Sequence, residues 1–235
     1  MEDNYKKLNP DLIEEQIKIL HNRIMERFPE SGVLRVSDQL INIIHDAKVR
    51  AKEISRPNYY IRISSIFMIA MIIFGIIYTV SQIDFHYQKV NFFEAFGVVE
   101  AGVNDLVFFA ILVFFLSSLE AKIKRKRALI AMEELRSIAH VIDMHQLNKD
   151  PQLLVAPGPA TESSPDRQFT VYEMGRYFNY CSEMLSLVAK ISAFYIQNIS
   201  DQTVLNTATE IEGLCSSLST KIWEKIKILH LHKEA

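Results

Sequence analysis

The sequence predicts an all-α protein that contains a transmembrane helical hairpin of two spans together with cytoplasmic helical hairpins. Hydrophobic residues make up 49% of the 235 positions, and only seven residues are glycine. Leu, Ile, Glu and Lys recur at helical spacing, with no turn-dense run of alternating strands. Two long apolar stretches are also flanked by basic residues, which is typical of membrane spans.

Residues 1–58 are predicted to form a cytoplasmic N-terminal helical hairpin. The pair Asn9-Pro10 is a favourable helix start, with Asn as the N-cap and Pro at the first helical position. Pro29 and Gly32 are expected to end this helix, and Ser37 is expected to open the next one.

Residues 59–122 are predicted to form the transmembrane hairpin with a short external loop. The first span, Ile63–Ile83, carries no charged side chain. At about 1.5 Å per residue it would be about 32 Å long, enough to cross a bilayer core. A buried helix of a soluble protein is the alternative. The residues expected to anchor the hairpin at the membrane interfaces are Tyr59, Tyr60, Arg62, Lys122, Lys124 and Arg125.

The second span has a shorter charge-free core, Leu106–Leu119, and needs snorkelling ends to cover residues 103–122. A re-entrant or interfacial helix is the alternative. The flanking charges favour a full crossing, because only Lys89 is basic between the spans. The basic residues that flank the spans are Lys48, Arg50, Lys52, Arg56, Arg62, Lys122, Lys124, Arg125, Lys126 and Arg127.

This charge bias predicts a multi-pass protein of the cell inner membrane with both termini in the cytoplasm. Between the spans, Val90–Glu100 is expected to lie on the outer surface as a short amphipathic helix. After the second span the helical pattern continues to about residue 148, so residues 123–149 are expected to extend that span into the cytoplasm. Prolines then mark residues 150–169 as a linker.

Residues 170–235 are predicted to form a C-terminal helical hairpin. Thr170–Glu173 reads as a capping box, and two apolar seams with coiled-coil spacing follow it. Leu187, Ile191 and Phe194 widen the apolar face of the first helix beyond one seam. This face should therefore also cover another helix, either from this chain or from a second copy. For that reason we expect a homo-oligomer, or a protein partner bound through the C-terminal hairpin.

No catalytic motif stands out, and we expect no catalytic residue, cofactor, metal ligand or nucleic-acid partner. One polar stripe is a candidate, because its residues follow spacings of three, four and three along one helix face. His140 and Asp143 would be neighbours there and suited to sharing a metal or a proton. The favoured interpretation is that these side chains form a solvated helix face or a face of salt bridges between subunits. The stripe consists of Glu133, Arg136, His140 and Asp143.

The stretches Glu134–Pro151 and Arg176–Leu187 resemble an uncharacterised family of bacterial two-span helical membrane proteins, along most of the chain. That resemblance carries no known activity. The order of a cytoplasmic helix, a membrane hairpin and a long following helix also resembles the SLATT class of two-span proteins. This second resemblance is architectural. SLATT proteins are proposed to be membrane-disrupting effectors of bacterial conflict systems, so the resemblance implies such a role for this chain only by analogy.

The functional expectation is a membrane-anchored helical interaction or scaffold module that oligomerises and has the lipid bilayer as one partner. An oligomeric pore-forming or membrane-perturbing effector is the alternative. A metal-dependent enzyme that uses Glu133, His140 and Asp143 ranks third.

Overall fold

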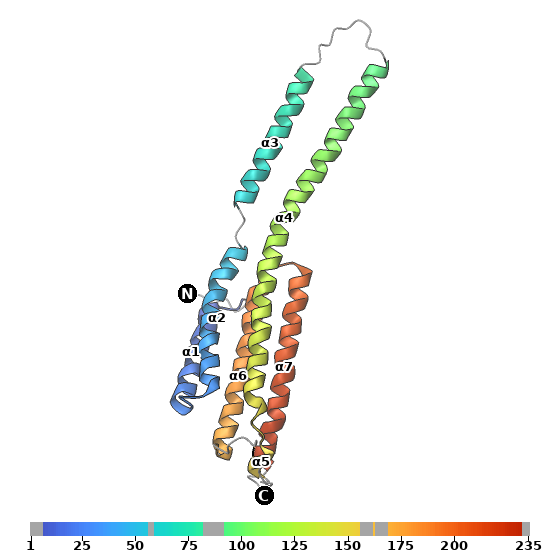
Figure 1. The fold of residues 1–235 in the computed structure, drawn as a ribbon. Helices are drawn as coiled ribbons and strands as arrows, with labels where there is room; N and C mark the ends of the chain where they lie inside the picture. Colours follow the sequence, from blue (N-terminus) through green and yellow to red (C-terminus); the bar gives the residue numbers. More distant parts are fainter. Residues whose placement is uncertain (1–6, 56–58, 82–91, 156–161, 163–168, 232–235) are drawn as a thin grey trace. The chain divides into compact units, whose positions relative to one another are not determined.

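The computed structural model of the chain describes residues 7–55, 59–81, 92–155, 162 and 169–231. The regular secondary structure in these ranges is helical, which confirms the predicted all-α class (Figure 1). The chain divides into two compact units, one made of Met1–Ser55 with Arg127–Ala235 and the other of Arg56–Lys126. The first unit is thus assembled from two separated stretches of sequence.

The N-terminal hairpin of the first unit consists of α1 (Pro10–Arg27) and α2 (Gly32–Ser55), which pack against each other. The predicted start of α1 is confirmed, because the Asn9 side chain accepts a hydrogen bond from the Asp11 amide at 2.9 Å. The predicted start of the second helix at Ser37 is wrong. Ser31 Oγ accepts a hydrogen bond from the Leu34 amide, and α2 already begins at Gly32.

The C-terminal hairpin consists of α6 (Val171–Ile196) and α7 (Gln202–Leu231), which also pack together. The capping box is confirmed: the Thr170 amide donates to Glu173 Oε2 at 2.8 Å, and the Glu173 amide donates to Thr170 Oγ1 at 3.2 Å. The predicted seam of α7 is buried as well. Its buried residues are Val204, Ala208, Ile211, Cys215, Leu218, Ile222, Ile226 and Leu229.

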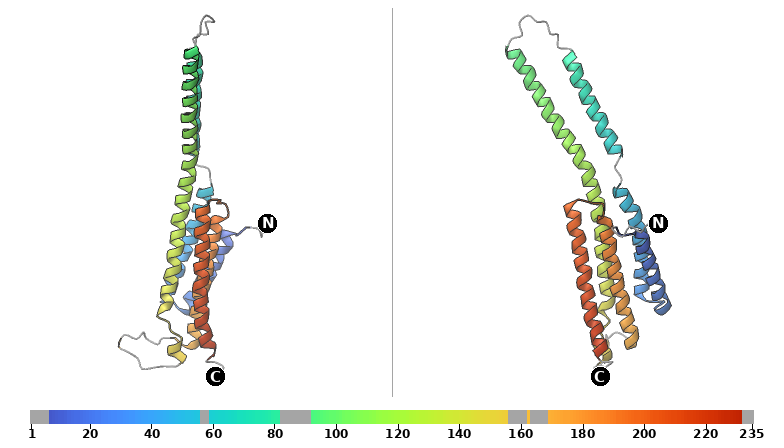
Figure 2. Two further views of the ribbon diagram at one scale, coloured as in Figure 1. Left: turned by 90° about the vertical axis from the view of Figure 1, so that its right-hand side faces the viewer. Right: turned by 180° about the vertical axis from the view of Figure 1, so that it is seen from behind.

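Helix α4 (Phe92–Leu147) contributes its C-terminal part to this bundle, beside α6 and α7 (Figures 1 and 2). One face of α4 is buried there, and the Arg50 side chain of α2 forms an ion pair with Glu134. The buried residues of this face are Ala128, Ala131, Met132, Leu135, Ile138, Ala139 and Ile142. Helix α6 contacts α1 and α2 in addition to α7. A single core therefore joins both hairpins and the end of α4.

This core covers the wide apolar face of α6 within the chain. Leu187 and Ile191 are buried, and Phe194 is partly buried against the same core. Helices of the same chain therefore cover this face, which is one of the two alternatives that the pattern left open. Sequence periodicity shows that a face is apolar but not which helix covers it.

The second unit contains α3 (Tyr59–Ser81) and the N-terminal part of α4. The expected separate helix at Val90–Glu100 is wrong over its described residues, because α4 runs without a break from Phe92. No proline interrupts α4, and an interior glycine costs a helix only about 1 kcal/mol. A short helix, α5 (Gln152–Val155), occupies the start of the predicted linker, and residues 156–161 and 163–168 lie outside the described residues.

Candidate functional site

One apolar stretch among the described residues has the length and composition needed to cross a membrane. It lies within Gly102–Leu154, in the region predicted as the second span, and none of it is buried. The apolar stretch described in α3, Ile63–Gly75, is shorter. In the sequence, the first predicted span has the longer charge-free stretch. In the described residues, the stretch long enough to cross a membrane belongs to α4.

Large apolar side chains are exposed along both helices of the second unit. Phe74 of α3 is 70% exposed, and Phe114 of α4 is 74% exposed. Other exposed members are Ile63, Ile66, Phe67, Met71, Ile73, Ile77, Val103, Leu106, Val107, Phe108, Ile111 and Phe115. Water is an unfavourable surrounding for such a surface, because each buried side chain of this size gains about 1.5–3 kcal/mol.

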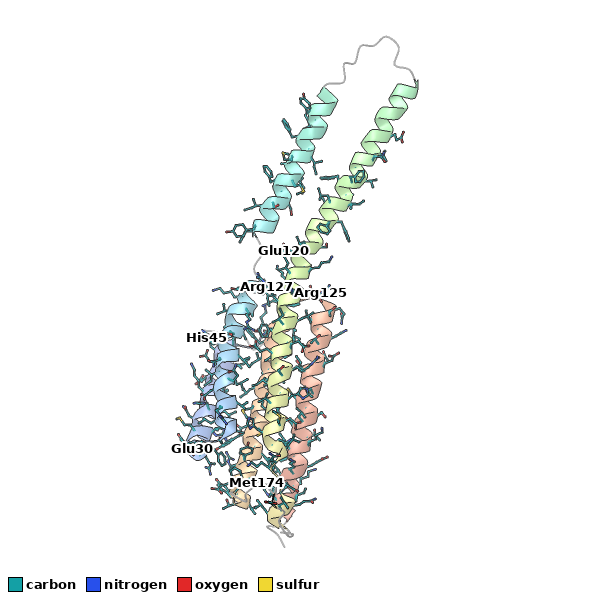
Figure 3. The ribbon with its side chains drawn as sticks, in the orientation of Figure 1. Glu30, His45, Glu120, Arg125, Arg127 and Met174 are labelled. Atoms are coloured by element: carbon teal, nitrogen blue, oxygen red, sulfur yellow. The ribbon has the colours of Figure 1, made fainter. Side chains whose placement is uncertain are left out.

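The predicted interface residues are found at the ends of these apolar stretches. Tyr59 and Tyr60 lie in the first turn of α3 and are exposed, while the side chain of Arg62 lies outside the described residues. Lys122 and Arg125 are exposed on α4, and Figure 3 labels Arg125. Lys124 forms an ion pair with Glu120 one helical turn earlier, at 2.9 Å.

The polar stripe on α4 does not gather into one site. Arg136 forms ion pairs with Glu133 at 3.1 Å and with Glu210 of α7 at 2.9 Å. His140 is exposed, and Asp143 accepts a hydrogen bond from Gln146 at 2.6 Å. Within the described ranges, no group of three metal-ligating side chains comes together. The ion pair that the stripe forms with another helix is therefore within the chain, between α4 and α7.

A polar contact that the sequence pattern did not reveal lies where α4 ends against α7. Lys225 Nζ donates to Gln146 Oε1 at 2.6 Å, to the Gln146 carbonyl at 2.9 Å and to the Lys149 carbonyl at 3.2 Å. A cation suits this position, because the last carbonyls of a helix lack intrahelical partners. Burial lowers the pKa of Lys225, against the opposing effect of Asp150 and Asp143.

A cavity of about 660 Å³ lies beside this contact, where the turn between α1 and α2 faces the end of α4. We call it the α4-end cleft. One wall is aromatic: the rings of Phe28 and Phe169 meet edge to face at 5.5 Å, and those of Phe28 and Tyr177 at 5.7 Å. The lining residues are Phe28, Pro29, Glu30, Ser31, Gly32, Met144, His145, Asn148, Lys149, Phe169 and Tyr177.

The polar side of the cleft comes mainly from the last turn of α4 and the residues after it. The Lys149 ammonium lies over the Phe169 ring at 4.6 Å and the Tyr177 ring at 5.8 Å, both within cation–π distance. The Tyr177 hydroxyl donates to the His145 carbonyl at 3.0 Å. Desolvation, with a smaller contribution from Arg35, lowers the pKa of His145, so its imidazole is neutral near pH 7.

Comparisons of the chain with protein-family models, curated proteins and solved structures found no match.

Proposed function

We propose that the chain is an integral membrane protein that holds a helical bundle at the cytoplasmic face of a membrane as an interaction module. Helix α3 and the N-terminal part of α4 would be the two spans, and Met1–Ser55 with Arg127–Ala235 would be the anchored module. Both termini would then lie in the cytoplasm, at the inner membrane of a cell.

The observation that carries this proposal is the exposed apolar surface of the second unit. Side chains such as Phe74 and Phe108 are largely exposed, at 70% and 73%, whereas the first unit has a buried apolar core. Lipid would cover the exposed set at no cost in hydrogen bonding, since the backbone of α3 and α4 is paired within each helix.

Length and charge support two spans. The 23 residues of α3 amount to about 35 Å of helix, which exceeds the hydrocarbon thickness of about 30 Å. Basic residues precede α3 and follow the apolar part of α4, while Lys89 alone is basic between the spans. This asymmetry favours a hairpin whose flanks both face the cytoplasm.

Fusion reporters test the arrangement directly. Reporters before Met1 and after Ala235 should both read cytoplasmic, and a short tag between Lys89 and Asn91 should read external. A cytoplasmic reading for that tag would rule out two spans and leave α4 as a re-entrant or interfacial helix.

The interaction role is supported by the shape of the first unit, which combines a packed core with an open cleft of about 660 Å³. The competing role, an oligomeric pore or membrane-perturbing effector, predicts a different result for the purified protein. Reconstituted into vesicles, an interaction module leaves the membrane sealed, whereas a pore releases an entrapped dye. Mass measurement in detergent gives the subunit count in the same preparation.

A further inference from the structure

We propose that the α4-end cleft binds a small aromatic monocarboxylate, with its carboxylate paired to Lys149 and its ring packed on Phe28 and Phe169. This site does not depend on the membrane arrangement proposed above, because every residue that lines the cleft belongs to the first unit.

Lys149 supplies a positive charge that a ligand carboxylate can pair with. In the part of the chain that the structure describes, its ammonium forms no ion pair and lies over the Phe169 and Tyr177 rings. Aromatic faces hold the cation in place but do not neutralise it. A ligand carboxylate that reaches Lys149 would form a charge-assisted hydrogen bond, which is about twice as strong as a neutral one.

The charges around the cleft favour a ligand with one negative charge over a ligand with two. Glu30, in the turn between α1 and α2 (Figure 3), lines the same cleft and would repel a doubly charged phosphate group. His145 is neutral and adds a polar ring without adding a second cation to the cleft. Arg35 of α2 is the cation whose field acts on His145, and Tyr177 of α6 keeps its proton because burial raises its pKa.

The aromatic wall of the cleft suits the ring of such a ligand. Phe28 is buried, and Phe169 is packed against the bundle core, so both rings are held by the fold. Their edge-to-face contact at 5.5 Å fixes a surface on which a ligand ring can pack. The volume of about 660 Å³ falls in the range of about 300–1,000 Å³ that is usual for small-molecule sites.

The cationic side of the cleft is held in place by the fold before any ligand binds. Lys225 of α7 binds the carbonyl of Lys149, and Tyr177 of α6 binds the carbonyl of His145. These contacts hold the end of α4 against two other helices, so little ordering cost remains for binding.

The test uses the full-length protein in detergent, with para-fluorophenylacetate as the probe and fluorine NMR as the readout. The neutral analogue para-fluorophenethyl alcohol has the same ring and measures partition into the micelle. Lys149→Gln removes the charge that the site needs, while Lys227→Gln is the matched control, since Lys227 is exposed on α7 away from the cleft lining. Thermal unfolding of each variant verifies that the bundle is folded.

We expect saturable binding of para-fluorophenylacetate by the wild type and by Lys227→Gln, and about tenfold weaker binding by Lys149→Gln. The imidazole resonances of His145 should also move when the probe is added to the wild type, a readout that needs no variant. Equal binding by wild type and Lys149→Gln would overturn the proposal. So would wild-type protein that shows only the micelle partition of the neutral analogue, with unmoved His145 resonances.

Discussion

The imidazole of His145 lies directly on the backbone of Gly32, at the point where α2 begins. A Cβ atom added to Gly32 would be 2.3 Å from His145 Cε1 and 2.6 Å from His145 Nδ1. Heavy atoms do not approach so closely, so any larger residue at position 32 must displace the ring. Glycine at this position lets the start of α2 come into direct contact with the His145 ring of α4.

Gly32→Ala should therefore destabilise the bundle by about 1–3 kcal/mol, the usual cost of forcing extra atoms into a packed contact. Gly213→Ala is the matched control, because a Cβ there meets nothing within 4 Å and alanine favours a helix. Denaturant unfolding of the full-length protein measures both. A Gly32→Ala variant as stable as Gly213→Ala would show that the His145 ring moves aside freely.

Lys225→Met should cost about 1–3 kcal/mol of stability, because it removes the cation that binds the carbonyl of Gln146 in the last turn of α4 and the carbonyl of Lys149 just after it. Gln146 is only 2% exposed and would lose the partner of its side-chain oxygen. Lys227→Met, two residues further on and exposed, should change stability by less than about 0.5 kcal/mol. Similar losses in both variants would argue against a specific role for Lys225.

Acid should weaken the contact between α1 and α2 through Glu14. Hydrogen bonds from Lys18 and Lys48 lower the pKa of Glu14 from 4.5 to about 2. Since the folded state depresses this pKa, the stabilisation is complete above pH 4.5 and is lost as the pH falls towards 2. Glu14→Gln should lower stability at neutral pH and flatten the dependence between these values. Parallel pH profiles of unfolding for wild type and Glu14→Gln would contradict this assignment.

The basic cluster after the apolar part of α4 should help to orient the membrane hairpin. Replacing the cluster with glutamine removes the positive-inside bias on that side, so the reporter fusions should then indicate more than one orientation. The replaced residues are Lys122, Lys124, Arg125, Lys126 and Arg127. An unchanged topology would mean that the residues before α3 determine the orientation alone.

His140→Ala should change the free energy of unfolding by no more than about 0.5 kcal/mol, because the side chain is exposed. The metal content of the purified protein should also stay the same. Stoichiometric metal in the wild type that is lost in His140→Ala or Asp143→Ala would favour the enzyme hypothesis instead.

Local patterns predicted much of the fold because helix caps and seams depend on neighbouring residues. Asn9 and Thr170 were recognisable as caps, and the α7 seam was readable from its spacing. Gly32 misled the prediction for the same reason: near a proline it resembles a helix end. Its reason for being glycine is His145, which is distant in the sequence and close only in the folded bundle.

The α4-end cleft was not predictable, because its walls come from four stretches of sequence that each look ordinary. Phe28 caps the end of α1, and Lys149 follows the end of α4 by two residues. Only the packing of α6 on α1 and α2 brings the aromatic wall to the end of α4. For the polar stripe, the spacing along one helix face was predictable but the partners of its side chains were not. Asp143 accepts a hydrogen bond from Gln146 on the same helix.

The assembly of the first unit from separated stretches has a consequence for biosynthesis. The ribosome completes α1 and α2 well before it reaches α6, the helix that packs on both of them. At about 5–20 residues per second the wait is on the order of ten seconds. During that time the α1–α2 hairpin lacks the cover of α6, so the nascent chain exposes the apolar side chains that α6 later buries. Chaperones that hold such surfaces would therefore act on this protein before its last two long helices are made.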